Sequence, residues 1–335
     1  MVSISPCTRS LGSVVAALDR RPRAWLIGAH DGRQPRLVAV MVAEEVRLDV
    51  VTVNYRSAAE IQRLSADLQE LAVLGIAYHL VVVDCSGEMA SDADSADMHV
   101  IDPGRNLGYG AACNLALTEV TADVTALLNP DLLIDPTTFA ALVRAGCSDG
   151  AIAWTGVLHN DDGSVQRNTA PPFTLGRLAA EYLLGVDTSF AITTTRRIVT
   201  TISGAVLLIR TAALRQVAGF DPQYPLYVED VDLTERLSTI GPVVQYPMVV
   251  AVHLGGRSSA HAPTTTTTLL HASRIRWFQQ QGRGRGFMAR SIVVTGCAVR
   301  WIVRPTARRS LNPLAIWTAG AASYQLAALL PPRVQ

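Results

Sequence analysis

The sequence predicts an α/β protein, with a doubly wound and mostly parallel sheet flanked by helices and a helical appendage at the C-terminal end. Short β-branched apolar runs, such as residues 48–54 and 80–84, alternate with stretches of helical periodicity. This spacing is typical of strand–helix–strand units that pair their strands in parallel. The chain has 335 residues, of which 49% are hydrophobic, and can therefore bury a large core.

The first 46 residues show no clean periodicity, and Met41 stands just before the first convincing strand. We interpret residues 1–46 as a loosely ordered extension, or as an over-extended start in which residues 1–40 are not part of the natural protein. From residue 47 onward, strands and helices alternate. We expect strands at residues 48–54, 80–84, 99–102 and 124–128, and helices at residues 58–74 and 108–119.

The next part of the chain is less regular. Residues 160–200 are polar and rich in threonine, which predicts loops and one short helix at 176–184. We then expect strands at 202–209 and 243–252, a helix at 211–217, an acidic segment at 226–240 and a Thr-rich linker at 263–268. Residues 47–260 are therefore predicted to form one domain.

Residues 261–335 differ in character and are predicted to be helical. Residues 269–281 have a helical pattern, 287–303 are apolar apart from Arg290 and Arg300, and 311–330 carry no charge. A membrane-spanning helix at 311–330 is disfavoured because Ala, Gly, Ser, Thr and Gln dilute its hydrophobicity. Two interpretations stay open: helices that lie on an anionic membrane surface, with flanking Arg304, Arg308 and Arg309, or a packed hairpin with a solvated basic turn.

Composition argues against several classes of protein. The net charge of +1 offers no footprint for nucleic acid, and all basic residues are arginine, so no lysine chemistry is available. Five scattered cysteines without CxxC spacing argue against a disulfide scaffold or a structural zinc site. Arginines at positions 20, 21 and 23 interrupt any signal-peptide core. We therefore expect a cytoplasmic protein.

Polar side chains follow the predicted parallel strands, where ligands of doubly wound sheets collect. Asn54 and Asp84 end the first two strands, and Asn129-Pro130-Asp131 follows the strand at 124–128. A carboxylate at the end of a buried strand is costly without a partner, and Mg²⁺ or Mn²⁺ bridging two phosphates is a natural one. The alternative is a plain Asn-Pro-Asp turn.

An acidic block holds Glu229, Asp230 and Asp232 within four positions. Carboxylates this close repel one another, which raises a pKa when they are partly buried, and a base that deprotonates a sugar hydroxyl needs such a shift. The alternative is that these residues favour the start of the following helix. Both hold if Asp232 caps the helix and Asp230 is the base.

Two further features indicate a functional site only in combination with these blocks. His253 ends a strand, where a lone histidine is more often structural than a metal ligand. The glycine-rich residues 104–110 precede a helix that carries Asn114, so that backbone amides can approach an anion. Such turns also serve packing alone.

In this order the blocks resemble the inverting glycosyltransferases of family 2, which have the GT-A fold, and in particular their bacterial rhamnosyltransferase-like branch. The matching stretches are VTVNYRS, VVVDCS, NLGYGAACNLAL, LLNPDLLID, ISGAVLLIR, GFDPQYPLYVEDVDLTERL and the His253 segment. They cover residues 48–258. Two departures stand out: Asn129 replaces the first acid of a strict DXD motif, and Cys85 replaces an Asn that is common after the base-binding acid.

The resemblance implies roles for the matching positions. Tyr55 would stack on the nucleotide base, and Asp84 would hydrogen-bond its edge. Asp131 and His253 would bind Mn²⁺ or Mg²⁺, and Asp230 would be the general base. The remaining candidates are Glu229 and Asp232, which would orient the base or meet the acceptor, and Asn106, Gly108, Asn114, Asn129 and Gly204, which would contact the nucleotide sugar.

We therefore expect a single displacement that moves a sugar from a dTDP- or UDP-sugar, rhamnose being the first suggestion. The expected acceptor is a glycan, or a glycan on a polyprenyl lipid at the inner face of the plasma membrane, in cell-envelope polysaccharide synthesis. Two alternatives stay open. A sugar nucleotidyltransferase would show a Gly-rich basic loop near its N-terminus, and none is found; a non-catalytic glycan-binding protein would not need Asp230, Asp131 and His253. No oligomeric state follows from the sequence.

Overall fold

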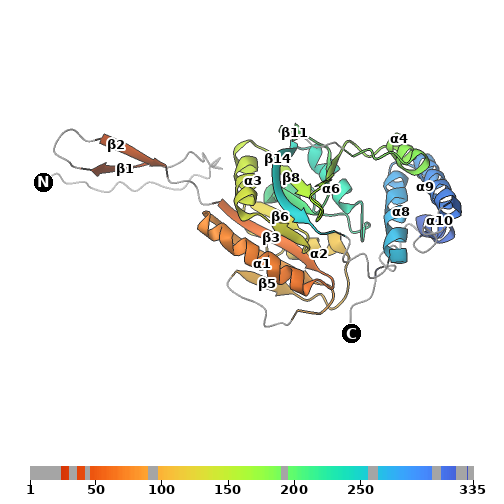
Figure 1. Cartoon of the computed structure of the whole chain (residues 1–335), viewed down its shortest axis with the longest axis horizontal. Coiled ribbons are helices and arrows are strands. Elements are labelled where there is room, and N and C mark those ends of the chain that lie inside the picture. The colour runs from red at the N-terminus through yellow and green to blue at the C-terminus, as the bar shows by residue number, and fades with distance from the viewer. Residues whose placement is uncertain are drawn as a thin grey trace, which may run out of the picture. The chain divides into compact units, whose positions relative to one another are not determined.

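The computed structural model describes residues 24–29, 36–41, 46–89, 97–189, 195–255, 263–303, 311–321 and 330. The chain divides into two compact units, Met1–Glu45 and Val46–Gln335. In the first unit, β1 (Ala24–Ala29) and β2 (Arg36–Met41) form an antiparallel hairpin (Figure 1). The sequence did not predict this hairpin, and the rest of the proposed extension lies outside the described residues.

The second unit is built on one large sheet. Its main strands are β3 (Val46–Asn54), β4 (Ile76–Asp84), β5 (Met98–Ile101), β6 (Val124–Leu128), β8 (Ala153–His159), β13 (Val206–Arg210) and β14 (Val243–His253). Their order is β14-β8-β13-β6-β3-β4-β5, and β13 alone among these seven runs antiparallel to its neighbours. The predicted α/β class with a mostly parallel sheet is confirmed.

Short strands extend this sheet and form one small ladder beside it. β7 (Leu132–Ile134) and β11 (Arg197–Ile198) pair antiparallel with β14, and β9 (Val165–Gln166) pairs antiparallel with β8. β10 (Thr169–Ala170) and β12 (Thr201–Ile202) form a separate antiparallel pair. The predicted loop region therefore contains short strands.

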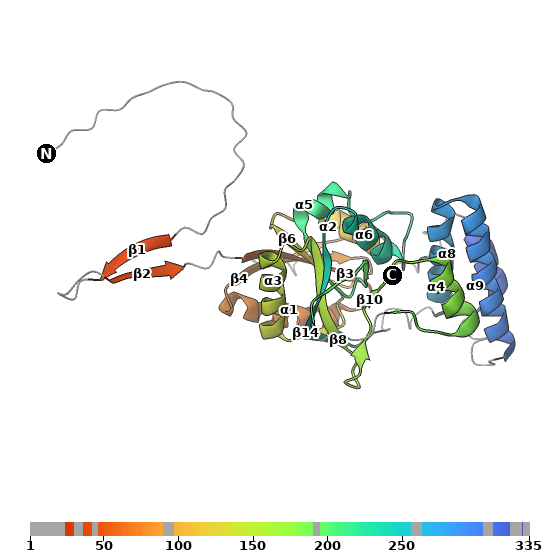
Figure 2. The same cartoon turned by 90° about the horizontal axis from the view of Figure 1, so that it is seen from above.

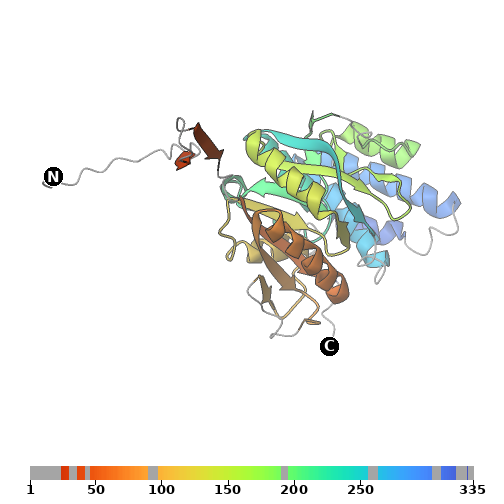
Figure 3. The same ribbon diagram turned by 60° about the vertical axis from the view of Figure 1, so that its left-hand side comes forward.

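Helices cover both faces of the sheet, because alternate residues of the central strands point to opposite sides. On one face, Val50 and Val82 pack with α1 (Ala58–Val73) and α3 (Pro136–Ser148), which lie side by side in Figure 3. On the other face, Val51 and Val83 pack with α2 (Tyr109–Ala116), α5 (Thr211–Gln216) and α6 (Glu229–Ser238). The strands are apolar on both sides for this reason.

A separate helical layer follows, away from the sheet (Figure 2). It consists of α4 (Leu175–Ala179), the π-helix η1 (Ala180–Leu184), α8 (Pro263–Gln280), α9 (Arg283–Val303) and α10 (Pro313–Ala321). A core that includes Leu178, Phe278 and Val293 holds them together. The predicted helical appendage is confirmed.

One prediction about this layer is wrong. The threonines at 263–268 begin α8 instead of forming a linker, because Thr266 and Thr268 are buried and packing overrides their weak helix propensity. Within the described part of the chain, α9 is the helix that is long and apolar enough to cross a membrane. In the structure, 28% of its most apolar stretch is buried within the protein. The candidate at 311–330 is described only as far as α10 and at residue 330, and Arg304, Arg308 and Arg309 lie outside the described residues.

Candidate active site

A cavity of about 290 Å³ lies at the carboxyl ends of β3 and β6, and we call it the Asp131 cavity. The residues of its lining that the sequence predicted for the site are Tyr55, Asn106, Gly108, Asn129, Asp131 and His253. They are joined by Val53, Tyr109, Pro130, Leu226, Tyr227, Thr266 and Leu330. Residues from several separate segments of the chain thus meet where doubly wound sheets bind ligands.

The glycine-rich turn forms one wall of the Asp131 cavity. Oδ1 of Asn106 accepts a hydrogen bond of 3.0 Å from the N–H of Gly108, and the N–H of Tyr109 donates to the carbonyl of Pro225 at 3.1 Å. Gly108 has a φ of +78°, and a Cβ placed there would lie 2.1 Å from the carbonyl oxygen of Pro225. Only glycine fits this position, both for its φ and for the space it leaves.

Asp131 and His253 lie side by side in this cavity. Nε2 of His253 is 3.1 Å from Oδ1 of Asp131 and 3.3 Å from Nδ2 of Asn129. On the other side of the ring, Nδ1 lies 2.9 Å from Oε1 of Gln166, an acceptor that requires Nδ1 to carry the proton. In the neutral ring, Nε2 then presents its lone pair toward Asp131, as a metal-ligating histidine does.

This donor set fits a divalent cation. An imidazole nitrogen and a carboxylate oxygen face each other at 3.1 Å, and when the nitrogen carries no proton, two acceptors so placed gain from a shared cation. Within the described residues, no group of three or more His, Cys, Asp or Glu side chains is placed to hold a metal. A cation held by Asp131 and His253 would therefore complete its coordination with oxygens of a bound phosphate or water.

Asp84 does not line the Asp131 cavity. Its buried Oδ1 accepts hydrogen bonds from Nδ2 of Asn54 and from the N–H groups of Ser86 and Gly87, all within 3.0 Å. Its Oδ2 accepts from the N–H of Met89 at 2.7 Å. Asp84 therefore fixes the loop after β4, and its contact with the nucleotide base stays a prediction.

A second cavity, of about 260 Å³, contains Asp230, and we call it the Asp230 cavity. Oδ2 of Asp230 accepts from the N–H of Gly204 at 2.9 Å, and Oδ1 accepts from the N–H of Val231 at 2.8 Å. The carbonyl of Gly204 accepts from the hydroxyl of Tyr109 at 3.1 Å. Gly204 therefore links a residue of the Asp131 cavity to the carboxylate of the Asp230 cavity.

Burial shifts the pKa values of the carboxyl groups at the start of α6. It raises the pKa of Asp230 above its ordinary value, and the two backbone donors offset part of that rise. Burial and the neighbouring Asp230 charge raise the pKa of Glu229 well above its usual range. Glu229 lines neither cavity, and its buried Oε2 has no hydrogen-bond partner among the described residues. Asp230 is thus the carboxylate of this block that reaches a cavity.

Two other candidates make structural contacts. Asn114 exchanges two hydrogen bonds of 2.8 Å with the backbone of Phe220 and lines neither cavity. Asp232 lines neither cavity, and its Oδ2 accepts from Nη2 and Nε of Arg236 at 2.6 and 2.8 Å. It makes no side-chain cap on α6, whose N-cap residue is Val228. The predicted capping role of Asp232 is wrong, because Arg236 takes up its carboxylate one turn along the helix.

The two cavities share Tyr227. Tyr227 and Val228 both have positive φ angles, 65° and 70°, directly before α6. Such angles are uncommon outside glycine and strained for a β-branched residue, and they cluster at functional sites. The turn places Tyr227 between the two cavities, so that it lines the one that contains Asp131 and also the one that contains Asp230.

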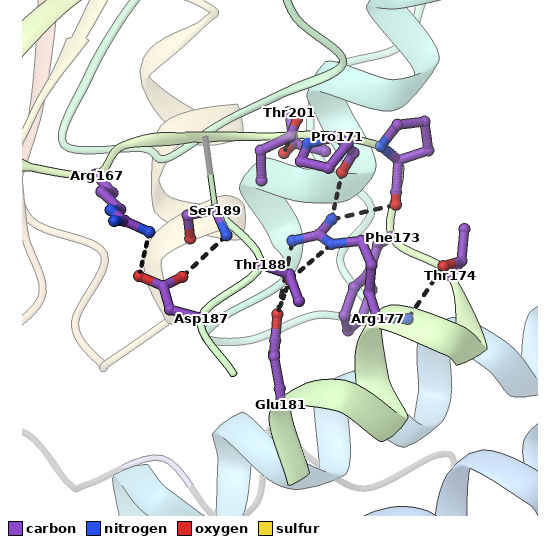
Figure 4. A network of polar contacts seen from close by, with 12 residues as sticks. Arg167, Pro171, Phe173, Thr174, Arg177, Glu181, Asp187, Thr188, Ser189 and Thr201 are labelled. Atoms are coloured by element: carbon purple, nitrogen blue, oxygen red, sulfur yellow. Dashed lines mark hydrogen bonds and ion pairs between the residues drawn. The ribbon is translucent and has the colours of Figure 1, made fainter. Parts of the chain in front are cut away.

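Arginines line the Asp230 cavity, and Figure 4 shows two of them, Arg167 and Arg177, with their polar contacts. Arg177 contacts the carbonyls of Pro171 and Pro172 and the hydroxyl of Thr188, and it lies 3.6 Å from Glu181. Arg274 also pairs with Glu181, at 3.1 Å.

Arg167 pairs with Asp187 at 3.1 Å, with both side chains partly exposed. The cavity is thus lined by the guanidinium groups of Arg167, Arg177 and Arg274 and by two carboxylates, those of Glu181 and Asp230. Arg167 is paired with Asp187, and Arg177 and Arg274 share Glu181, so the charges at this cavity are largely balanced. The guanidinium groups can still donate hydrogen bonds to an anionic group of a ligand beside Asp230.

Several residues that line the two cavities or contact their lining were not predicted from the sequence. Tyr109 belongs to the glycine-rich block and could have been singled out there. Gln166 and Arg167 come from a segment predicted as loops, and Arg274 comes from the helical appendage. No spacing in the sequence connects them with Asp131 or Asp230, so only the packing of the folded chain reveals them.

The sequence matches the family described as "Glycosyltransferase like family 2" over residues 37–280. It is similar to the N-acetylglucosaminyl-diphospho-decaprenol L-rhamnosyltransferase of Mycobacterium tuberculosis, with 27% identity over 68% of this chain and 82% of that protein. It is also similar to the low-salt glycan biosynthesis hexosyltransferase Agl10 of Haloferax volcanii, with 26% identity over 56% of this chain and 61% of that protein. A solved mannosyltransferase of Pyrobaculum calidifontis aligns with 15% identity and a TM-score of 0.49, over 84% of this chain and 86% of that one.

Proposed function

Because the chain belongs to glycosyltransferase-like family 2 and is a glycosyltransferase, we propose that it moves a hexose, with rhamnose as the first candidate, from a dTDP- or UDP-sugar to a lipid-linked glycan. One observation carries this proposal. The Asp131 cavity and the Asp230 cavity are neighbours, since Tyr227 lines both, and this supports a donor in the first and an acceptor in the second that meet beside Asp230.

The Asp131 cavity is the proposed donor site. Tyr55 offers a ring on which a nucleotide base can stack, and Asn106 and Gly108 form a turn at the start of α2. Its volume of about 290 Å³ is near the lower end of what small-molecule sites provide. A nucleotide diphosphate in this cavity would place its phosphates beside Asn129 and Asp131.

The pair of Asp131 and His253 is the proposed cation site. Oδ1 of Asp131 and Nε2 of His253 would hold Mg²⁺ or Mn²⁺, and Gln166 would orient the imidazole through Nδ1. When bound, the cation would supply positive charge that stabilises the departing diphosphate. Asn129 adds an amide beside this pair, which can donate a hydrogen bond to a phosphate oxygen.

Asp230 is the proposed general base. Its carboxylate would accept the proton of an acceptor hydroxyl while that oxygen forms a bond to the anomeric carbon. The bond between the anomeric carbon and the donor phosphate breaks, and its electron pair leaves with the nucleotide diphosphate. Attack from the face opposite the leaving group inverts the configuration, and the raised pKa of Asp230 suits a base better than an ordinary aspartate.

The Asp230 cavity is the proposed acceptor site. Its arginines suit an acceptor that carries phosphate, and the relative from M. tuberculosis is named for a diphospho-decaprenol acceptor. We propose a glycan on a polyprenyl diphosphate, taken at the cytoplasmic face of the membrane during synthesis of a cell-envelope polysaccharide. The enzyme would then be cytoplasmic and peripheral on the membrane.

The test is a transfer assay with purified full-length chain. Candidate donors are dTDP-rhamnose and UDP-sugars, each with and without Mn²⁺, and the acceptor is a synthetic N-acetylglucosaminyl diphosphate with a short polyprenyl chain. We expect transfer from one donor, dependence on the cation, and a product whose anomeric configuration by NMR is opposite to that of the donor. Retained configuration would contradict the single displacement, and no transfer from any of these donors would contradict the proposed substrates.

A further inference from the structure

The C-terminal part of the chain has an unusual charge balance. Residues 236–335 contain twelve arginines and no aspartate or glutamate, whereas the whole chain has a net charge of +1. The positive charge of the protein is therefore concentrated in the segment that contains α8, α9 and α10. Such an asymmetry indicates an anionic partner for this segment.

A third cavity, of about 480 Å³, lies where α8 ends and α9 begins, and we call it the arginine cavity. Arg276, Arg283 and Arg290 line it together with Gln279, Gln280, Gly286 and Phe287, and no carboxylate of the described part of the chain does. It shares no lining residue with the Asp131 cavity or the Asp230 cavity. Three guanidinium groups in one cavity can donate hydrogen bonds to a phosphate.

The packing of the two helices buries parts of Arg276 and Arg290, whereas Arg283 is exposed. Arg276 is only 7% exposed, and the Nε of Arg290 is buried without a hydrogen-bond partner among the described residues. Gly286 lets α9 approach α8, since a Cβ there would lie 2.5 Å from Cγ of Gln279. A buried guanidinium N–H that lacks an acceptor gains from an anion placed in the cavity.

The surface beside the arginine cavity is apolar. The exposed large apolar side chains of α9 and α10 are Phe287, Met288, Val299, Trp301, Ile302, Val303, Leu314 and Trp317. Ala289, Val293 and Cys297 lie on the buried face of α9. The guanidinium of Arg290 stacks on the ring of Trp317 at 3.4 Å, which connects the cavity with α10. One face of α9 therefore packs inside the protein while apolar side chains elsewhere on it meet solvent.

We propose that the arginine cavity binds the phosphate group of an anionic membrane lipid. A helix with one packed face, exposed apolar side chains and arginines at its start suits the boundary between headgroups and acyl chains. The arginines also gain from the negative surface potential of an anionic leaflet. The lipid phosphate would lie in the cavity, and Phe287 and Met288 would enter the membrane next to it. This binding does not depend on the proposed transfer reaction.

The experiment measures binding of the full chain to vesicles of phosphatidylcholine alone and of phosphatidylcholine with phosphatidylglycerol. The test variant is Arg283→Gln, and the matched control is Arg285→Gln, an exposed arginine two positions away that does not line the cavity. We expect the wild type to bind the anionic vesicles more tightly than the neutral ones. Arg283→Gln should lower the affinity for the anionic vesicles by about tenfold or more, the effect of losing a hydrogen bond to a charged group. In the control variant this affinity should fall by no more than about fivefold, the effect of removing one surface charge.

Thermal stability with inorganic phosphate separates the two sources of this ligand. Stabilisation by phosphate that disappears in Arg283→Gln, without vesicle binding, would support the phosphate site and overturn its assignment to a lipid. Equal losses in both variants would overturn the site itself, because general positive charge would then explain the binding. Equal binding to neutral and anionic vesicles, with no stabilisation by phosphate, would also overturn it.

Discussion

Oδ2 of Asp230 accepts a hydrogen bond of 2.9 Å from the backbone N–H of Gly204. The carbonyl of the same glycine accepts from the hydroxyl of Tyr109, which lines the neighbouring cavity. One residue of the ISG segment thus holds the proposed base in position and connects it to the proposed donor site. Because the N–H donor stabilises the carboxylate, it also limits how far burial raises the pKa of Asp230.

Replacing Asp230 by asparagine should remove the base and leave the donor site intact. We expect Asp230→Asn to lower kcat by about 100-fold or more, the usual effect of losing a general base, with donor affinity unchanged. Transfer assays and calorimetric titration of the donor measure the two effects. Asp232→Asn is the matched control: it should lower the melting temperature by breaking the pair with Arg236 and keep transfer per folded molecule. Unchanged turnover in Asp230→Asn would remove Asp230 from its role.

The activity should depend on pH through the same carboxylate. A general base must be ionised, and burial raises the pKa of Asp230 above its ordinary value of 3.8. Activity should therefore be lost as the pH falls through this raised pKa, and recovered as the pH rises above it. The profile of kcat/KM against pH measures the position of this acidic limb. A limb at the value of an ordinary aspartate would contradict the buried setting of Asp230.

Glu229 should cost stability at neutral pH. Burial raises its pKa well above the usual range, so its contribution to folding is present below the unfolded-state pKa and lost as the pH rises through the folded-state pKa. Glu229→Gln keeps the shape and removes the titration. We expect the variant to gain stability relative to the wild type as the pH rises above the ordinary glutamate pKa of 4.5. Urea unfolding at several pH values measures this, and a difference that does not vary with pH would contradict it.

Gln166 should affect cation binding without touching the cation. Its Oε1 holds Nδ1–H of His253, which leaves Nε2 free to ligate. Gln166→Met keeps the size of the side chain but removes this acceptor, and we expect the affinity for Mn²⁺ to fall by about 10-fold or more. Thermal shifts with Mn²⁺ and a nucleoside diphosphate measure the affinity, with exposed Gln223→Met as the control. Equal Mn²⁺ affinity in both variants would show that Gln166 does not position His253.

Gly108 and Gly163 form a matched pair for testing the glycine-rich turn. Both have a φ of +78°, but a Cβ on Gly108 would lie 2.1 Å from the carbonyl of Pro225, whereas one on Gly163 would meet nothing within 4 Å. Gly163→Ala should cost about 1–2 kcal/mol of unfolding free energy from its φ alone. Gly108→Ala should cost clearly more and weaken donor binding. Chemical denaturation compares the two, and equal costs would mean that the turn shifts freely away from Pro225.

The regular part of the fold could be predicted from local patterns. The apolar strands and the helix that buries Ile61, Leu64 and Leu68 follow from periodicity, which depends only on neighbouring residues. The start of α8 could not be predicted in this way, because Thr266 and Thr268 have weak helix propensity and are held by tertiary packing. The positive φ angles of Tyr227 and Val228 could not be predicted either, because neither residue type favours such a backbone conformation.

Local residue patterns were enough to establish the α/β class. The carboxylates, the histidine and the glycines of the candidate site lie in compact blocks, and their resemblance to family 2 singled them out. Which of them line a cavity depends on the folded chain. Asp131, His253 and Asp230 line a cavity. Asn114 instead hydrogen-bonds to Phe220, and Asp232 pairs with Arg236. The reason is physical: a polar side chain can act on a ligand only when folding leaves it at a cavity with spare hydrogen-bonding capacity, and its partners come from segments far away in the chain.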